Sequence, residues 1–282
     1  MNLNVTYMLV KIGFLLIFTV LIARKSITLS LKLLKEAGCV MENYRGNEVV
    51  FGMGIAFIPI IISSELLVFL MYSNQLYIHV FYLFAICAIG FAGLLDDLIG
   101  NRKIKGLKNH ITSFFRGQLT TGFIKAFIGV TSSIIISIGI SMNILDFTLN
   151  IFNMALFTNA LNLMDLRPGR CIKIFLAIGM LILFVNLKDA IILLPLIIIL
   201  VSSIVYMSYD LRELCMLGDT GSNIFGITLG YFSSVEFETT SKILIFLALI
   251  TINFIAEKVS ITEIISNNRI FNYLDSLGRS RG

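Results

Sequence analysis

Residues 190–208 have the sequence AIILLPLIIILVSSIVYMS, which contains no charged side chain. As a helix this stretch would rise roughly 28 Å, close to the hydrocarbon thickness of a bilayer. Similar apolar runs recur along the 282 residues, of which 57% are hydrophobic and 14% charged, whereas a soluble domain carries about 25% charged residues. The sequence therefore predicts an all-α fold, a polytopic membrane helix bundle, because no alternating pattern typical of barrel strands appears.

Nine segments are apolar enough to be predicted as transmembrane helices. They are 6–23, 50–71, 76–95, 119–140, 144–163, 172–186, 190–208, 221–235 and 241–256. The first segment has no small-residue cleavage site, and Arg24 and Lys25 follow it directly, so we predict a retained helix rather than a signal peptide. No internal repeat or low-complexity linker divides the chain, which predicts one integral membrane domain over 1–282.

The distribution of positive charge predicts the orientation. Of the 22 Lys and Arg residues, 17 lie in the loops that one side of this topology would carry, whereas the opposite side holds only Lys188 and Lys242, the latter at the very start of the span 241–256. The basic loops are 24–49, 96–118, 164–171, 209–220 and 257–282. The positive-inside rule makes them cytoplasmic, with the N-terminus outside and the C-terminus inside. This bias also accounts for the net charge of +5 without a nucleic-acid partner.

Cysteine and histidine predict no metal centre. The four cysteines are scattered without a C-x-x-C pair, and His79 and His110 are too few for a histidine-based zinc site. Four unreactive thiols are the expected state.

The third predicted helix ends in the sequence Gly93-Leu94-Leu95-Asp96-Asp97, and a basic loop follows it. Adjacent carboxylates at a membrane boundary are costly unless they are solvated, paired or bound to a cation. They suit a hard cation such as Mg²⁺, and the basic loop suits a phosphate-bearing ligand. An acidic helix end beside a loop that anchors to anionic lipid is the alternative, which residue types leave open.

The fifth predicted helix ends in the sequence NALNLMD at 159–165, where a spacing of three places both asparagines and Asp165 near one face. Amides at membrane depth face the bundle interior, where they contact a ligand or only another helix. The sequence LRPGR at 166–170 then forms a turn that presents Arg167 and Arg170. Their forked donors suit phosphate, although a turn that only fixes topology is equally basic.

The segment LGDTGSN at 217–223 opens the eighth predicted helix. Its small residues would let a ligand approach the N–H groups at the helix N-terminus, although a simple helix cap has the same features. The predicted topology brings Asp96, Asp97, Asp165 and Asp219 to one membrane face. Together the three segments indicate a metal–diphosphate site beside the bilayer.

These motifs resemble those of the polyprenyl-phosphate sugar-1-phosphate transferases, which include phospho-N-acetylmuramoyl-pentapeptide transferase and the lipid-linked N-acetylglucosamine-1-phosphate transferases. Gly90-Phe91 through Asp96-Asp97, with Lys105-Gly106-Leu107, resembles the first family signature. Residues 159–165 resemble the N-x-x-N-x-x-D signature, and residues 217–222 resemble M-G-D-x-G-S. The resemblance extends over 43–278. It implies transfer of a sugar-1-phosphate from a UDP-sugar to polyprenyl phosphate with release of UMP, in cell-envelope glycan synthesis at a bacterial plasma membrane.

The resemblance also implies roles for individual residues. Asp219, with Asp97 nearby, would hold Mg²⁺, and Asp96 would be the base, so these three acids form the expected catalytic set. Asn162 and Asp165 would position the nucleotide or a water molecule. The expected phosphate contacts are Lys105, Lys125, Arg167 and Arg170. The implied partners are the UDP-sugar, polyprenyl phosphate and membrane lipid, and a homodimer is left open.

The sequence departs from the family pattern at several positions. Pro168 stands where the family has a second Asp, no His-rich loop follows Glu257, and the family's tenth helix has no counterpart. These departures motivate an alternative function, a protein that binds lipid phosphate without turnover. A transporter is less favoured, because the polar motifs gather at one face rather than at the midplane.

Overall fold

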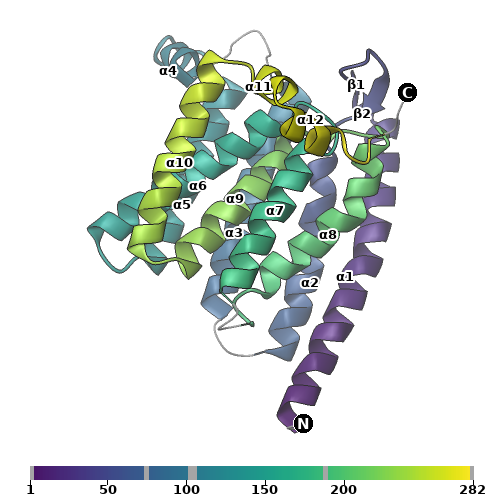
Figure 1. Cartoon of the computed structure of the whole chain (residues 1–282), viewed down its shortest axis with the longest axis vertical. Helices are drawn as coiled ribbons and strands as arrows, with labels where there is room; N and C mark the ends of the chain where they lie inside the picture. Colours follow the sequence, from purple (N-terminus) through teal and green to yellow (C-terminus); the bar gives the residue numbers. More distant parts are fainter. Residues whose placement is uncertain (1–2, 73–75, 101–106, 187–189, 280–282) are drawn as a thin grey trace.

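The computed structural model describes residues 3–72, 76–100, 107–186 and 190–279, which form a bundle of helices (Figure 1). In chain order the elements are α1 (Leu3–Glu36), β1 (Val40–Glu42), β2 (Glu48–Val50), η1 (Met53–Ala56), α2 (Phe57–Met71), α3 (Leu76–Ile99), α4 (Leu107–Phe115), α5 (Thr121–Ile140), α6 (Ile144–Met164), α7 (Arg170–Val185), α8 (Leu194–Leu211), α9 (Gly218–Glu236), α10 (Thr239–Lys258), α11 (Ile261–Asn267) and α12 (Arg269–Ser276). One end of the bundle carries α4, the two strands, α11 and α12. We call it the cavity end.

The predicted class, a helical membrane bundle, is confirmed. Among the described residues, seven helical segments are long and apolar enough to cross a membrane: Thr6–Glu36, Met53–Met71, Tyr77–Ile99, Thr121–Ile140, Ile144–Met164, Leu194–Leu211 and Thr239–Lys258. The other two predicted spans are also helical. They correspond to α7, which has only 16 residues, and to α9, whose first turns are polar. The number of spans and their orientation stay predictions.

The cavity end differs from the predicted loops. The first helix does not stop near 23 but continues to Glu36, and α4 lies inside the predicted loop 96–118. A short antiparallel hairpin, with Val40 paired to Val50, is a small exception to the all-α prediction. The Asn43 side chain forms the turn of this hairpin by accepting hydrogen bonds from the N–H groups of Arg45 and Asn47. Asparagine favours such turns because its side chain mimics a backbone carbonyl.

Helix α9 forms the centre of the bundle, and every residue from Thr220 to Ser234 is buried. It packs against α6. Gly226 and Gly230 of α9 lie directly against the α6 backbone at Thr158 and Met154. Small residues allow such close helix approach where lipid provides little hydrophobic driving force between helices. The central position of α9 fixes its N-terminus, and with it Asp219, among α3, α5 and α6.

Two buried polar pairs lie at the other end of the bundle. Lys242 at the start of α10 pairs with Asp146 at the start of α6 over 2.6 Å, and His79 Nδ1 lies 2.7 Å from Glu65 Oε2. Both pairs join helices near the loops opposite the cavity end. They therefore belong to the packing of the bundle and not to the candidate site.

Candidate functional site

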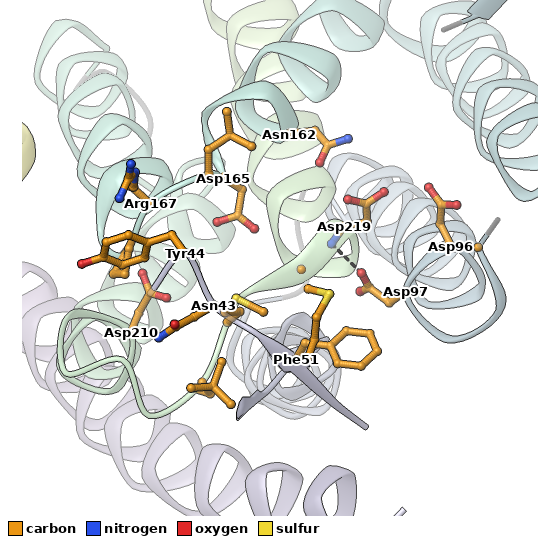
Figure 2. A pocket seen from close by; sticks show the side chains of 18 of the residues that line it. Asn43, Tyr44, Phe51, Asp96, Asp97, Asn162, Asp165, Arg167, Asp210 and Asp219 are labelled. Atoms are coloured by element: carbon orange, nitrogen blue, oxygen red, sulfur yellow. Dashed lines mark hydrogen bonds between the residues drawn. The ribbon is translucent and has the colours of Figure 1, made fainter. Parts of the chain in front are cut away.

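A cavity of about 540 Å³ opens among the polar motifs (Figure 2). Six of the residues that sequence analysis singled out line it: Asp96, Asp97, Asn162, Asp165, Arg167 and Asp219. They come from the end of α3, the end of α6 with the turn after it, and the start of α9. The fold thus brings the three sequence motifs together, as the predicted topology required.

One polar cluster of the site joins four helices, α3, α5, α6 and α9. Lys125 of α5 donates to Asp219 Oδ2 over 2.6 Å and to Asp96 Oδ2 over 3.3 Å. When the Asn162 amide is oriented so that both its nitrogen and its oxygen have partners, the nitrogen donates to Asp219 Oδ1 over 2.9 Å and the oxygen accepts from Lys125 Nζ over 3.0 Å. Lys125 therefore pairs with both acids and neutralises part of their charge.

Asp97 caps the N-terminus of α9. Its Oδ1 accepts from the Asp219 N–H over 2.8 Å, and its Oδ2 accepts from the Thr220 N–H over 2.9 Å and from the Thr220 hydroxyl over 2.6 Å. The α3 backbone can approach this closely because residue 93 is glycine, where a Cβ would lie 2.6 Å from Thr220 Cα. Asp97 therefore caps α9 from a neighbouring helix, a role that the sequence did not predict, and its metal-ligand role stays a prediction.

Asp165 lies just beyond α6 and faces the same cluster (Figure 2). Burial raises the pKa of Asp165 well above its ordinary value, and the negative charges of Asp210, Asp219 and Asp97 raise it further. A hydrogen bond from the Gly218 N–H acts in the opposite direction. A carboxyl group in this position holds its proton readily, and a cation bound in the cavity would lower its pKa.

Arg167 lies across the cavity from Asp96 and Asp219 (Figure 2). Its guanidinium stacks over the Tyr44 ring, with its carbon 4.2 Å from the ring centroid, and no acceptor in the described chain pairs with it. The Tyr44 hydroxyl donates to Glu213 Oε1 over 3.0 Å, and Asn43 Nδ2 donates to Glu213 Oε2 over 3.2 Å. The hairpin and the α8–α9 loop thereby hold the platform under Arg167 in place.

Arg170 points elsewhere. It is buried and forms two hydrogen bonds with Asp275 of α12, at 2.8 and 3.0 Å, and a third with the Thr262 hydroxyl at 3.0 Å. It does not line the cavity, so the predicted phosphate contact is not formed in this arrangement. Lys105, the remaining predicted phosphate contact, lies outside the described residues. Asn159, the first residue of the second motif, bonds Asn253 of α10 over 2.6 Å, the helix-to-helix alternative.

Several cavity residues were missed by the sequence analysis: Asn43, Tyr44, His110, Asp210 and Glu213. His110 of α4 lies 2.9 Å from the Thr120 hydroxyl that caps α5, and Asp210 accepts from the Gly169 N–H over 2.6 Å. Glu213 is the only described non-glycine residue with positive φ, at 56°. Backbone strain of this kind concentrates at functional sites, but no sequence pattern reveals it.

The donor set bears on the predicted magnesium ion. In the part of the chain that is described, no three His, Cys, Asp or Glu side chains are grouped to hold a metal ion. Magnesium is commonly held by one or two carboxylates together with substrate phosphates and water. Asp219, Asp165 and Asp97 all line the cavity. The partners of Asp219 are the side chains of Lys125 and Asn162, which a cation could displace, whereas Asp97 is held mainly by fixed N–H groups of the α9 backbone, so Asp219 and Asp165 fit that pattern better.

Comparison with known proteins adds no family assignment. No protein-family model matches the chain, and a search of curated proteins finds no match. The class that the fold and the cavity define is a membrane-type helix bundle with an acidic, partly enclosed site at one end.

Proposed function

We propose that this protein transfers a sugar-1-phosphate from a UDP-sugar to polyprenyl phosphate, with release of UMP, at the cytoplasmic face of a bacterial plasma membrane. The observation that carries the proposal is the cluster of Asp219, Asp96 and Asn162, which line one cavity, around the ammonium of Lys125. Three separate sequence motifs and α5 contribute to that cluster. A transferase that joins two anions needs such a set, because it must neutralise charge and align both reactants.

The charge of the cavity supports a metal-dependent reaction. Six carboxyl side chains line it, and Arg167 is its only lining Lys or Arg within the described residues. A diphosphate would be repelled by such a wall unless a cation accompanied it. Magnesium held by Asp219 and Asp165 would supply that charge and stabilise the departing UMP. The proposal therefore assigns the metal to Asp219 and Asp165, and leaves Asp97 to hold the helix that carries Asp219.

The remaining residues align the reactants. Lys125 already contacts both Asp96 and Asp219, so its ammonium is placed to exchange a carboxylate for a phosphate oxygen when substrate binds. Asp96 is partly exposed and would accept the proton of the lipid phosphate, whose oxygen then forms the bond to the β-phosphorus. The bond from that phosphorus to the UMP oxygen breaks. Arg167 offers its fork to a further anionic group on the opposite wall.

A second function, binding of lipid phosphate without turnover, is favoured by one observation. Lys125 and the α9 N-terminus already compensate Asp96, Asp97 and Asp219 within the protein. A site that only binds lipid phosphate could keep this arrangement and contact the phosphate through Arg167 alone. We favour the enzyme, because buried acids near lipid are costly to keep without a catalytic role.

Purified protein in lipid nanodiscs, given Mg²⁺, polyprenyl phosphate and a panel of UDP-sugars, should release UMP. Asp96→Asn is the matched negative variant, because the side chain is partly exposed and its loss should leave the fold intact. Folded protein that releases no UMP from any donor would refute the transferase. Retained binding of polyprenyl phosphate in that case would support the binding function instead.

A further inference from the structure

Helix α12 exposes its apolar side. Ile270, Phe271, Tyr273, Leu274 and Leu277 are each more than half exposed. On a helix with 3.6 residues per turn these positions form one continuous face. Asp275 lies outside that face, and its side chain is only 8% exposed. The helix thus exposes large apolar side chains and directs the Asp275 carboxylate towards the rest of the protein.

Ionic contacts hold this helix to the bundle. Asp275 accepts two hydrogen bonds from the buried Arg170, and Arg279 Nη2 lies 2.9 Å from Asp275 Oδ1. Lys173 of α7 donates to the carbonyl groups of Leu274 and Asp275 over 3.0 and 2.9 Å. We call Arg170, Lys173, Asp275 and Arg279 the clamp.

The clamp touches the wall of the cavity. Arg279 Nε donates to the Pro168 carbonyl over 2.8 Å, and Pro168 and Arg167 line the cavity from the same turn. Arg170, at the end of that turn, is the central cation of the clamp. The position of α12 is therefore tied to the position of the turn that presents Arg167.

We propose that α12 rests with its apolar face on the lipid surface at the cavity end, and that the clamp transmits this docking to the cavity-lining turn. A face of five large apolar side chains is costly in water and suits the boundary between headgroups and acyl chains. The preceding long helix α10 is apolar enough to span and ends at Lys258, so lipid lies close to α11 and α12. The segment from Glu257 to Arg279 carries three acids and three bases, so the apolar face and not net charge carries the docking.

The chain contains no tryptophan, which makes a single-tryptophan test possible. Tyr273→Trp places the reporter on the apolar face, and Asn272→Trp places it on the polar side of the same helix. Both proteins are reconstituted in nanodiscs containing anionic lipid, with bromine on the upper acyl chain as the quencher. The Tyr273→Trp protein should be quenched by the brominated lipid and protected from acrylamide, with a blue-shifted emission. The Asn272→Trp protein should show the reverse.

Equal access of acrylamide to both reporters would overturn the proposal. Protection from acrylamide without quenching by brominated lipid would also overturn it, since a second copy or another protein would then cover the face. Hydrogen exchange tests the clamp separately. Asp275→Asn should speed amide exchange over 166–170, and unchanged exchange there would exclude coupling to the cavity wall. None of these outcomes depends on UMP release, so they stand apart from the transferase assay.

Discussion

Replacement of Asp97 by asparagine separates a structural role of this acid from a catalytic one. The carboxylate accepts three hydrogen bonds from the first turn of α9, one on Oδ1 and two on Oδ2. Asparagine keeps one oxygen. If that oxygen faces Thr220, the new amide nitrogen faces the Asp219 N–H, and one donor is left without an acceptor.

The structural cost follows from these contacts. A buried donor that loses its acceptor costs about 1–3 kcal/mol. Loss of a negative charge at a helix N-terminus costs a further ~0.3–2 kcal/mol. We therefore expect Asp97→Asn to lower the free energy of unfolding by roughly 3 kcal/mol. Because α9 carries Asp219, activity should fall together with stability.

Thermal unfolding in detergent can be followed with a thiol-reactive fluorophore, since Cys171 and Cys215 are free and buried. The matched control is Asp96→Asn, one residue earlier on α3, whose carboxylate contacts Lys125 at the longer distance of 3.3 Å. The control should unfold near the wild-type temperature but lose turnover. An Asp97→Asn protein with wild-type unfolding and only a reduced rate would refute the capping argument and restore Asp97 as a metal ligand.

Four further outcomes follow from the same contacts. Lys125→Gln should reduce UMP release about 10²-fold, measured at saturating donor, because a positioned charge next to both acids is lost; a near wild-type rate would remove it from the site. Arg167→Ala should raise KM for the UDP-sugar without changing thermal unfolding, whereas Arg170→Ala should cost about 3 kcal/mol of stability, because Asp275 loses both hydrogen bonds from the buried Arg170 and keeps only its ion pair with Arg279; the opposite pattern would exchange their roles. Burial tends to raise the pKa of Asp275, but the hydrogen bonds and charges of Arg170 and Arg279 outweigh it and hold that pKa below its ordinary value. The stability that the clamp adds should therefore be complete above about pH 4 and fade as the pH falls further, so that wild type and Asp275→Asn unfold alike only in strong acid; a difference that persists there would contradict this assignment. Reporter fusions at Met1 and Gly282 should place the N-terminus outside and the C-terminus inside, and both ends on one side would contradict the predicted orientation.

Sequence alone located six of the polar residues that line the cavity, because polar residues are rare and costly in an apolar chain. The acids of α3, α6 and α9 stand out against long hydrophobic runs, and the alternation of loops places them at one end. Helix length and hydropathy then predict the bundle well. The spans were less predictable for α7 and α9, since protein rather than lipid covers most of α9 and its composition no longer reports on membrane depth.

Residue type did not reveal the role of each charged side chain. Asp96 and Asp97 are neighbours of the same type, yet one pairs with Lys125 and the other caps a helix. Arg167 and Arg170 belong to one turn, yet one faces the cavity and the other is buried in the clamp. For the two acids the difference arises because α3 rotates successive side chains by about 100°, so they meet different neighbours. For the two arginines it arises because Arg167 lies in the turn itself, whereas Arg170 is the first residue of α7 and packs against α12.

The contributions of the hairpin and the C-terminal helices were missed for a related reason. Asn43 and Tyr44 reach the cavity only because Glu213, some 170 residues later and in a strained conformation, accepts their hydrogen bonds. Asp275 reaches the cavity wall only through Arg170 and Arg279. Glu213 and Asp275 thus each hold their cationic or hydrogen-bonding partners on the side of the cavity where Arg167 lies. The fold therefore separates two tasks: one wall gathers acids around Lys125, and the other, supported by Glu213 and Asp275, presents Arg167, which pairs with no acceptor in the described part of the chain.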